Sequence, residues 1–559
     1  MPLTSPYNFV PINKQVYYPN WGKLVSMDVP FEDGEDGYIE VTFKNVSPLY
    51  TRNGARQERD TKKRETLSSH IVDEHGKRHY FIPAATIKGM LRSTLEIMAF
   101  GKINESEHYS NRWFGYRDIA QETAESKEYI KMVNQGRPGW LSKQGNQYFF
   151  TECDGELDKI LIETLVQNYP GHKNDDRTSI WEVNCSVRKD QNNNPTYPIY
   201  HKGNREYRIV CSGAMGGKLH ELLFPKRLKQ PITLDDVTIK AFKSVYEQTK
   251  DFNKFMSALD KDKEQKVPVF YLFVDGMKFP VIGLSRMFRI PSKNSLTDMI
   301  RKEQAEQKDA DLDLCETMFG RTSGDLSLKG RVQIGHAFAM NQVEDKQLVL
   351  VDGILGQPKA SYYPLYVKQN KNPYKTYDTG TALSGRKIYR VHKGATTISL
   401  PQPRGRSNMA NPFYALPTGT TFKLRINVHN LKKVEIGALL SALTIHETEG
   451  VFHNLGLAKS FGYGKIQIES VTLHKLRYSC DDYELAFEDA MDEFLSACEG
   501  QEVRWCDSKQ VTMLVSILSE HEDRDVKLMN LKEYSIYKDT DNFSRLKEGD
   551  AALFSFKYE

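Results

Sequence analysis

The chain has 559 residues, with 39% hydrophobic and 27% charged side chains and a net charge of +4, an ordinary balance for a globular protein of roughly two to four domains. No segment approaches the roughly 20 uncharged apolar residues of a membrane span, the N-terminal residues lack the apolar run of a secretory signal, and none of the seven cysteines forms a Cys-x-x-Cys pair. We therefore expect a cytoplasmic protein with no membrane partner, no disulfide framework and no zinc site.

The first clear element is a strand at residues 38–46, where Ile39, Val41 and Phe43 alternate with polar residues. A polar, basic stretch at residues 51–65 follows it. This stretch has too few apolar residues to pack, so we expect a loop that becomes ordered on binding a ligand.

A helix is predicted to begin near Pro83 and to end near Gly101, because four apolar residues recur at helical spacing: Ile87, Leu91, Leu95 and Met98. Lys88 and Arg92 are four residues apart and project from one side of its first turns. The backbone N–H groups at a helix start favour phosphate, so this segment is a candidate phosphate contact. The alternative is a solvated basic stripe opposite the apolar one.

The second clear block lies far downstream. Residues 422–428 alternate as a strand, residues 436–443 carry the apolar stripe of an amphipathic helix, and residues 465–473 return to strand character. Between that helix and that strand lies Gly456–Lys465, which we call the glycine-rich loop. A dinucleotide-binding site needs the reverse order, strand then glycines then helix, so that class is excluded.

The glycine-rich loop is a candidate for close approach by a ligand, because glycines leave the backbone uncovered. Its lysines, Lys459 and Lys465, could neutralise phosphates. The alternative is a tight helix-to-strand turn with ordinary surface lysines.

These elements predict an α+β chain with a ferredoxin-like βαββαβ core. We expect the first part of the core at residues 1–118, an insertion at 119–280 and the second part at 281–475. Residues 476–559 hold 20 acidic and 10 basic side chains and form a helical C-terminal region, which leaves the preceding residues net +14. A basic body beside an acidic tail favours a polyanionic partner for the body, although charge scattered over two solvated surfaces is the alternative.

Three motifs resemble those of the RAMP superfamily, the ferredoxin-like RNA-binding proteins of CRISPR systems. Residues 82–93 are similar to its I-P-G-S-S-L-K-G-x-L-R signature, with Ala84 and Ala85 in place of the usual Gly and Ser. Residues 318–332 resemble its F-G … G-R-V element, and Gly456–Lys465 resembles its glycine-rich loop. Residues 280–292 loosely echo the first motif, so two fused ferredoxin-like domains are an alternative to one enlarged copy.

The resemblance is strongest to an enlarged backbone subunit of type III (Csm/Cmr-like) effector complexes. It implies that the chain binds the phosphate backbone of a guide RNA, positions target RNA for antiviral defence and contacts other effector subunits. The RNA contacts that it implies are Arg52, Lys88, Arg92, Lys459, Gly462, Gly464 and Lys465.

Some subunits of this kind also cut target RNA, using an aspartate in the loop after the first strand together with a divalent metal. Asp60 lies among basic residues and is the first candidate here, with Asp73 as the alternative. Mg²⁺ would then be the cofactor, and without catalysis we expect none. The rival hypothesis is a stand-alone, metal-independent endoribonuclease that processes CRISPR transcripts through a histidine such as His70, His75 or His79. A third is a structural adaptor whose acidic tail docks a basic partner.

Overall fold

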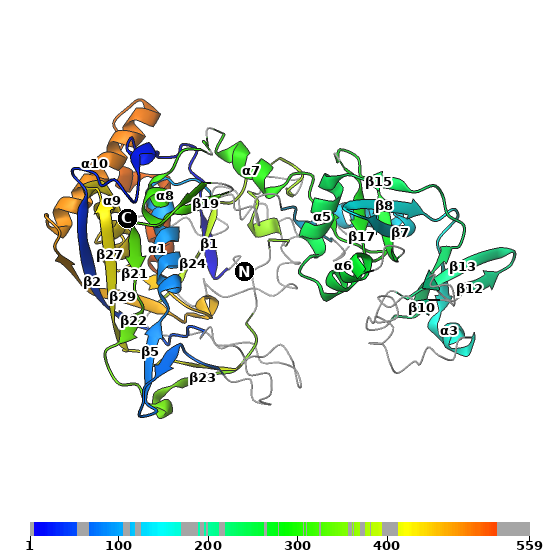
Figure 1. Cartoon of the computed structure of the whole chain (residues 1–559), viewed down its shortest axis with the longest axis horizontal. Coiled ribbons are helices and arrows are strands. Elements are labelled where there is room, and N and C mark those ends of the chain that lie inside the picture. The colour runs from blue at the N-terminus through cyan, green and yellow to red at the C-terminus, as the bar shows by residue number, and fades with distance from the viewer. Residues whose placement is uncertain are drawn as a thin grey trace.

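The structure is a computed structural model that describes residues 5–52, 66–103, 112–117, 124–168, 188–189, 195–196, 199–211, 218–261, 265–277, 279–305, 307–308, 310–323, 326–355, 360–361, 363–368, 375–380, 382–393 and 412–521. Figure 1 shows them as a larger body around the longest sheet and a smaller body with two shorter sheets. Among these residues, no helix combines the length and the apolar character that crossing a membrane requires.

The larger body is built on an antiparallel sheet. Its principal elements in chain order are β2 (Glu35–Asn45), α1 (Ala84–Met98), β21 (Val332–Ile334) with β22 (Ala337–Ala339), β27 (Thr421–Leu431), α9 (Lys433–Thr444) and β29 (Lys465–His474). In space β29 pairs with β2, β2 with β27, and β27 with both β21 and β22. Counted as βαββαβ, the strands lie in the order 4-1-3-2, so the predicted ferredoxin-like fold is confirmed.

The apolar pattern predicted five of these elements, β2, α1, β27, α9 and β29, but no strand at β21 or β22. Val41 of β2 and Leu424 of β27 lie opposite each other in the ladder and are both buried. Leu91 of α1 and Leu439 of α9 are buried in the same cluster, and these two helices contact each other. One face of the sheet is therefore covered by α1 and α9, while the other carries the polar residues that alternate with the apolar ones.

Shorter strands extend this sheet at both edges. β5 (Arg78–Ile82) pairs with β22, and β4 (His70–Val72) then pairs with β5. At the opposite edge, β28 (His453–Asn454) pairs with β29. The sheet thus has eight strands in all among the described residues.

The described part of the C-terminal region shares this core. α10 (Cys480–Glu499) packs along α9, and α11 (Lys509–Leu518) contacts α1. Phe487, Met491 and Trp505 are buried in the same cluster as the sheet. Asp481, Asp482, Asp489 and Glu493 are exposed on the outer surface of α10, whereas Glu484 is buried against α9.

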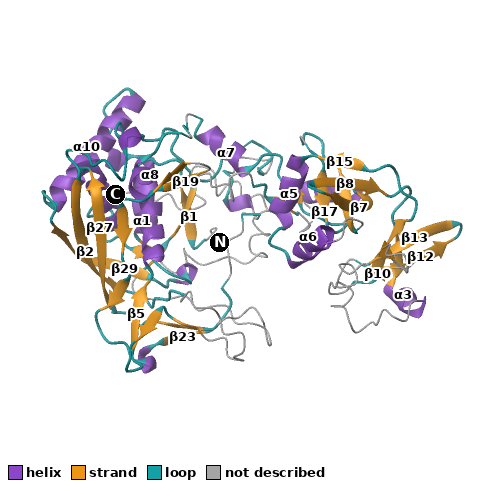
Figure 2. Cartoon of the chain, viewed as in Figure 1, coloured by secondary structure: helices purple, strands orange, loops and turns teal. Residues whose placement is uncertain are grey.

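The smaller body holds a five-stranded sheet in the order β15-β8-β7-β16-β17, from β7 (Arg137–Gln144), β8 (Gln147–Glu152), β15 (Ile232–Leu234), β16 (Lys266–Leu272) and β17 (Val281–Gly283). Figure 2 shows α5 (Asp236–Tyr246) and α6 (Lys250–Lys261) beside this sheet. β7 and β8 form a direct hairpin with no helix between them, so this sheet is not a second βαββαβ copy. Its core runs from Tyr129 to Ile290, and the chain re-enters the main sheet only at Val332.

A second sheet of the smaller body has the order β12-β13-β14-β9. The remaining elements are β1 (Tyr7–Val10), η1 (Gly22–Leu24), β3 (Thr66–Leu67), β6 (Gly115–Tyr116), α2 (Ala124–Asn134), β9 (Asp158–Leu161), α3 (Ile162–Asn168), β10 (Arg188–Lys189), β11 (Pro195–Thr196), β12 (Ile199–Lys202), β13 (Arg205–Val210), β14 (His220–Pro225), β18 (Ile290–Pro291), α7 (Leu296–Glu303), α8 (Leu314–Phe319), β19 (Arg321–Ser323), β20 (Leu326–Leu328), η2 (Asp345–Gln347), β23 (Val349–Val351), η3 (Tyr363–Leu365), β24 (Arg386–Tyr389), β25 (Val391–His392), β26 (Phe413–Ala415), η4 (Lys459–Phe461), η5 (Trp505–Asp507) and β30 (Glu520–His521).

Candidate nucleic-acid interface

A pocket of about 390 Å³ lies between α1, the glycine-rich loop and β24. Two segments that the sequence analysis selected independently, the helix after Pro83 and the glycine-rich loop, therefore form opposite walls of one site. The wall from α1 includes Ala85, Gly89 and Ser93, which are exposed and follow one another at four-residue spacing, and beside them Thr86, Met90 and Thr94. Because the first three are small, the helix backbone is accessible, and a Cβ placed on Gly89 would meet no atom within 4 Å.

Two lysines, Lys387 and Lys459, line the pocket. Both ammonium groups lie over the ring of Tyr389, with Nζ 5.3 Å (Lys387) and 5.4 Å (Lys459) from its centroid. Desolvation by the pocket walls lowers the pKa of Lys459, and desolvation followed by repulsion from Lys459 lowers the pKa of Lys387. Within the part of the chain that the structure describes, neither lysine has a carboxylate partner, so both charges are available to an anion.

The strand pair β1–β24 positions Lys387. β1 and β24 run antiparallel, with Tyr7 opposite Tyr389 and Phe9 opposite Lys387. The Lys387 ammonium also lies 5.4 Å from the centroid of the Tyr7 ring. The two aromatic rings thus stabilise the Lys387 ammonium by cation–π contact and leave its positive charge in place.

Lys387 and Tyr389 were not among the site residues predicted from the sequence. The local sequence could have indicated them. They are two residues apart in a strand, so their side chains lie on the same face, and a basic side chain beside an aromatic one is typical of nucleic-acid binding. What could not be read from the sequence is that this strand lies against α1, which precedes it by about three hundred residues.

Lys88 and Arg92 do not line the pocket. The Lys88 ammonium donates to the backbone oxygen of Phe319 at 3.2 Å, and burial, with a smaller contribution from Arg92, lowers its pKa. Arg92 Nε donates to Glu96 Oε1 at 2.9 Å, and Glu96 also accepts from Arg386 at 3.1 Å. Both motif cations therefore have partners inside the protein.

Lys465 also faces inward. Its side chain is only 3% exposed, its ammonium pairs with Glu520, and it donates to the backbone oxygen of His392 at 3.3 Å. Although it was predicted as a phosphate contact, its position makes it a structural cation that holds β30 against β29.

The glycines of the loop serve the protein's own packing. Gly462 and Gly464 have φ values of +83° and +79°, in the left-handed region that favours glycine. A Cβ on Gly464 would lie 1.7 Å from the backbone oxygen of Leu455. The close approach predicted for a ligand is therefore made by the chain itself.

Asp60, the first catalytic candidate, lies outside the described residues, and Arg52 is exposed at the edge of that gap. Asp73 lies in the turn between β4 and β5, where its Oδ1 accepts from the backbone N–H groups of His75 (3.0 Å) and Lys77 (2.9 Å). Its Oδ2 is 2.8 Å from His79 Nε2, and this hydrogen bond is the main reason that its pKa is lowered. Asp73 thus stabilises a turn.

Neither Asp73 nor the neighbouring histidines form a metal site. In the described ranges no three side chains of His, Cys, Asp or Glu are grouped so as to hold a metal ion. His70 Nδ1 lies 2.8 Å from the Ser68 backbone oxygen, and none of His70, His75 and His79 lines the pocket of Lys387 and Lys459. Asp73 and these histidines therefore do not make a divalent-metal site, while Asp60, the first catalytic candidate, is not among the described residues.

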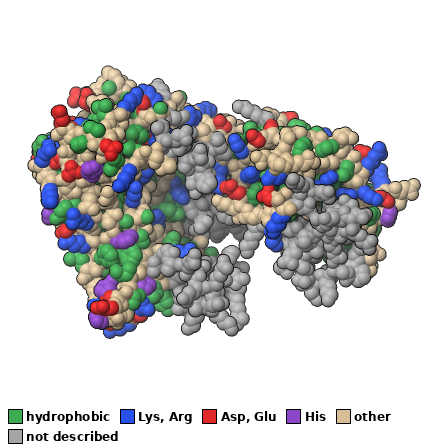
Figure 3. Space-filling model, in the orientation of Figure 1, with side chains coloured by type: hydrophobic (Ala, Val, Ile, Leu, Met, Phe, Trp, Pro, Cys, Tyr) green, Lys and Arg blue, Asp and Glu red, His purple; other side chains and the backbone are tan. Residues whose placement is uncertain are grey.

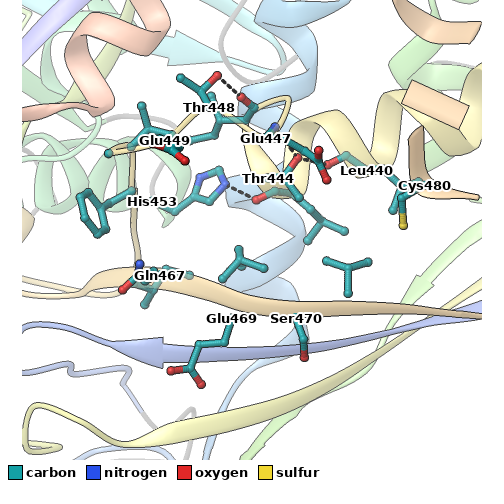
Figure 4. A pocket seen from close by; sticks show the side chains of 18 of the residues that line it. Leu440, Thr444, Glu447, Thr448, Glu449, His453, Gln467, Glu469, Ser470 and Cys480 are labelled. Atoms are coloured by element: carbon teal, nitrogen blue, oxygen red, sulfur yellow. Dashed lines mark hydrogen bonds between the residues drawn. The ribbon is translucent and has the colours of Figure 1, made fainter. Parts of the chain in front are cut away.

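A second pocket, of about 630 Å³, lies at the C-terminal end of α9 beside β28 and β29. Figure 4 shows Glu447, Glu449 and Glu469 among its lining side chains. Glu484 also lines it. The pocket is lined by acidic residues and by no lysine or arginine, so it does not suit an RNA backbone.

The chain was compared with curated proteins, solved structures and protein-family models. No curated protein matches the chain. Among solved structures, a chain described as "CRISPR RNA-guided surveillance complex, pre-nicking" is 11% identical, with a TM-score of 0.20, and the match covers 92% of this chain and 100% of that one. A likeness of that extent carries no argument about this chain.

A model of the RAMP superfamily matches residues 42–233. The match takes in only the last four residues of β2, all of α1 and much of the smaller body, and it ends before the glycine-rich loop. Over these residues the chain is similar to the RAMP superfamily, in agreement with the resemblance of its motifs, and the 4-1-3-2 sheet is the ferredoxin-like fold that this resemblance implies.

Proposed function

We propose that the chain is a subunit of a CRISPR effector complex and that the pocket of Lys387 and Lys459 binds the sugar–phosphate backbone of RNA. The observation that carries the proposal is that Lys387 and Lys459, which have no carboxylate partner among the described residues, line one pocket with the superfamily's helix motif and its glycine-rich loop. Other positively charged residues of the two motifs are already engaged with protein atoms.

The chemistry of the pocket suits a backbone better than a base-specific ligand. Two ammonium groups supply point charges for phosphate, and the small side chains of Ala85, Gly89 and Ser93 let a bulky ribose approach the helix. Binding of this kind tolerates any sequence and weakens with salt, as a guide-RNA scaffold requires.

The test is RNA binding by the full chain, measured by fluorescence anisotropy with a single-stranded RNA over a range of salt concentrations. In the variant Lys387→Gln/Lys459→Gln we expect weaker binding and a shallower salt dependence. Each phosphate contact that is lost lowers the slope of log K against log salt by about 0.7 for a single strand, so the double variant should lose about 1.4.

The control is Lys346→Gln, because Lys346 is 80% exposed and pairs with Glu344. It removes one positive charge, half of what the double variant removes, away from the pocket, and should leave the slope almost unchanged. Equal slopes for the double variant and the wild type would refute the proposal, and equal losses in both variants would show a general charge effect instead of a site.

We further propose, from the resemblance, that the complex is of type III, that target RNA pairs with the bound guide and that Asp60 with Mg²⁺ is the candidate for cleaving it. Purification from the native host supports this assignment if short, uniform RNAs come with the protein. Cleavage of repeat RNA in the presence of a chelator would favour the stand-alone endoribonuclease instead.

A further inference from the structure

The face of the main sheet opposite α1 and α9 carries planar side chains on five neighbouring strands. The outward positions of β27 include Lys423 and Arg425, which alternate with buried Phe422, Leu424 and Ile426. The strand pairings place Tyr38 of β2, His474 of β29, Phe338 of β22 and Phe81 of β5 on this same face. We call it the open face.

One group of planar side chains centres on Tyr38. Its ring stacks on the His474 ring, with centroids 4.3 Å apart and planes within 12° of parallel. The Arg425 guanidinium lies 3.8 Å from the Tyr38 centroid. These three groups come from three adjacent strands and form one planar row.

A second group centres on Phe338, which is 41% exposed. Its ring centroid lies 5.6 Å from that of Phe81 and 6.3 Å from that of His336. His336 is held in place because its Nδ1 accepts from the backbone N–H of Ala84 at 2.9 Å. Met340, 60% exposed, adjoins the group, and Figure 3 shows hydrophobic and histidine side chains gathered over β5 and β22.

The open face leaves one arginine without a carboxylate. Lysines pair with two of its carboxylates, Lys423 with Glu40 and Lys44 with Glu469, and Asp36 lies against His429. Arg425 is a cation whose polar partner on this face is an amide, Asn427 Oδ1 at 2.9 Å. An additional ligand therefore meets planar rings and an arginine that has no carboxylate partner among the described residues.

We propose that the open face stacks the unpaired bases of a single-stranded RNA, with Phe338 and the Arg425–Tyr38–His474 row as two stacking positions. Exposed aromatic rings and arginine planes on a sheet are the groups on which unstacked bases are bound, and every base offers a face for them. Phe338 lies opposite Lys423 and Tyr38 opposite Asn427, so the two positions are about four residues, roughly 13 Å, apart along β27 and two strand spacings, roughly 10 Å, apart across the sheet. The proposal extends the proposed RNA binding from phosphates to bases, at a site on the other face of the sheet.

The test uses the full chain and two probes of equal length: an oligouridylate, and a ribose-phosphate oligomer without bases. In Phe338→Ala we expect binding of the oligouridylate to weaken about tenfold, the usual effect of losing one stacked base, while binding of the abasic oligomer stays unchanged. Phe338→Tyr keeps a ring and should restore binding. Arg425→Ala, at an exposed position, should weaken the oligouridylate selectively too, and thermal unfolding of each variant confirms that it is folded.

The two probes separate this proposal from the proposed function. Lys387→Gln/Lys459→Gln should weaken both oligomers alike, whereas Phe338→Ala should affect only the one with bases. Unchanged oligouridylate binding in both Phe338→Ala and Arg425→Ala overturns the stacking proposal even if the lysines matter. A loss of self-association in Phe338→Ala, seen by sedimentation with RNA binding intact, would show that the face docks protein and also overturns it.

Discussion

Arg331 and Glu435 form an ion pair in which both side chains are completely buried. Arg331 comes from the G-R-V element just before β21, and Glu435 lies in the first turn of α9. Arg331 Nε also donates to the Thr317 backbone oxygen at 3.0 Å, while Glu435 Oε1 accepts from the Thr317 hydroxyl at 2.9 Å. The pair thus joins the point where the chain re-enters the sheet to the second helix of the ferredoxin-like core.

Removing one member of this pair should destabilise the protein strongly. In Arg331→Met the Glu435 carboxylate is left buried without its counter-ion, and we expect the free energy of unfolding to fall by about 3–5 kcal/mol in a urea titration. Replacing both, in Arg331→Met/Glu435→Leu, should recover much of the loss. A change of less than about 1 kcal/mol in the single variant, the range of exposed pairs such as Lys346–Glu344, would contradict this.

Two glycines with similar φ angles allow a matched comparison of stability: Gly464 lies in the glycine-rich loop and Gly450 lies just before it. Gly464 has φ +79° and no room for a Cβ, whereas Gly450 has φ +73° and no atom within 4 Å of an added Cβ. Gly450→Ala should therefore cost only the left-handed backbone strain, about 1–2 kcal/mol. Gly464→Ala should cost clearly more in the same thermal or urea measurement, because its Cβ would displace the Leu455 backbone. Equal effects would show that the loop moves freely.

The ferredoxin-like core could be predicted because its apolar residues follow the period of their element. Ile87, Leu91, Leu95 and Met98 mark α1, and the alternation in residues 421–431 marks β27, and all of these are buried as expected. The arrangement of the smaller body could not be predicted, because the β7–β8 hairpin pairs with strands far downstream, β16 beside β7 and β15 beside β8.

The sequence predicted two of the segments that line the pocket, but not which of their charged side chains face it. Lys88 and Lys459 look alike in sequence, yet one donates to the Phe319 backbone and the other lies in the pocket. Whether a lysine faces solvent or a distant backbone oxygen depends on contacts hundreds of residues away. Arg331 is a further example, because it resembles the other basic motif residues in sequence but is buried in the core.

Glu484 makes stability depend on pH. It lies on α10 facing α9, its Oε1 accepts from the Thr444 hydroxyl at 3.0 Å, and burial, aided by Glu447 and Asp481, raises its pKa to about 7. Between its unfolded pKa of 4.5 and about 7, the folded state holds the proton more tightly, so stability falls as pH rises through this window.

Glu484→Gln removes this dependence and keeps the shape of the side chain. We expect the variant to gain stability relative to the wild type as pH rises from 5 to 8, by at most about 3 kcal/mol and less where solvent screens the carboxylate. Urea titrations at three pH values measure it. A constant difference across the pH range would show that Glu484 is ionised in the folded protein throughout.

Replacing Gly89 by a larger residue should stabilise the protein and weaken RNA binding. It lies inside α1, where glycine costs about 0.5–1 kcal/mol relative to alanine, and an added Cβ meets nothing, so Gly89→Ala should raise the free energy of unfolding by about that amount. The same Cβ projects into the pocket of Lys387 and Lys459, so RNA affinity should fall while stability rises. Gly89→Leu, also a good helix former, should keep the added stability and weaken binding further. If affinity instead stays constant from glycine to leucine, RNA does not approach this helix, and the two lysines must be reached from another direction.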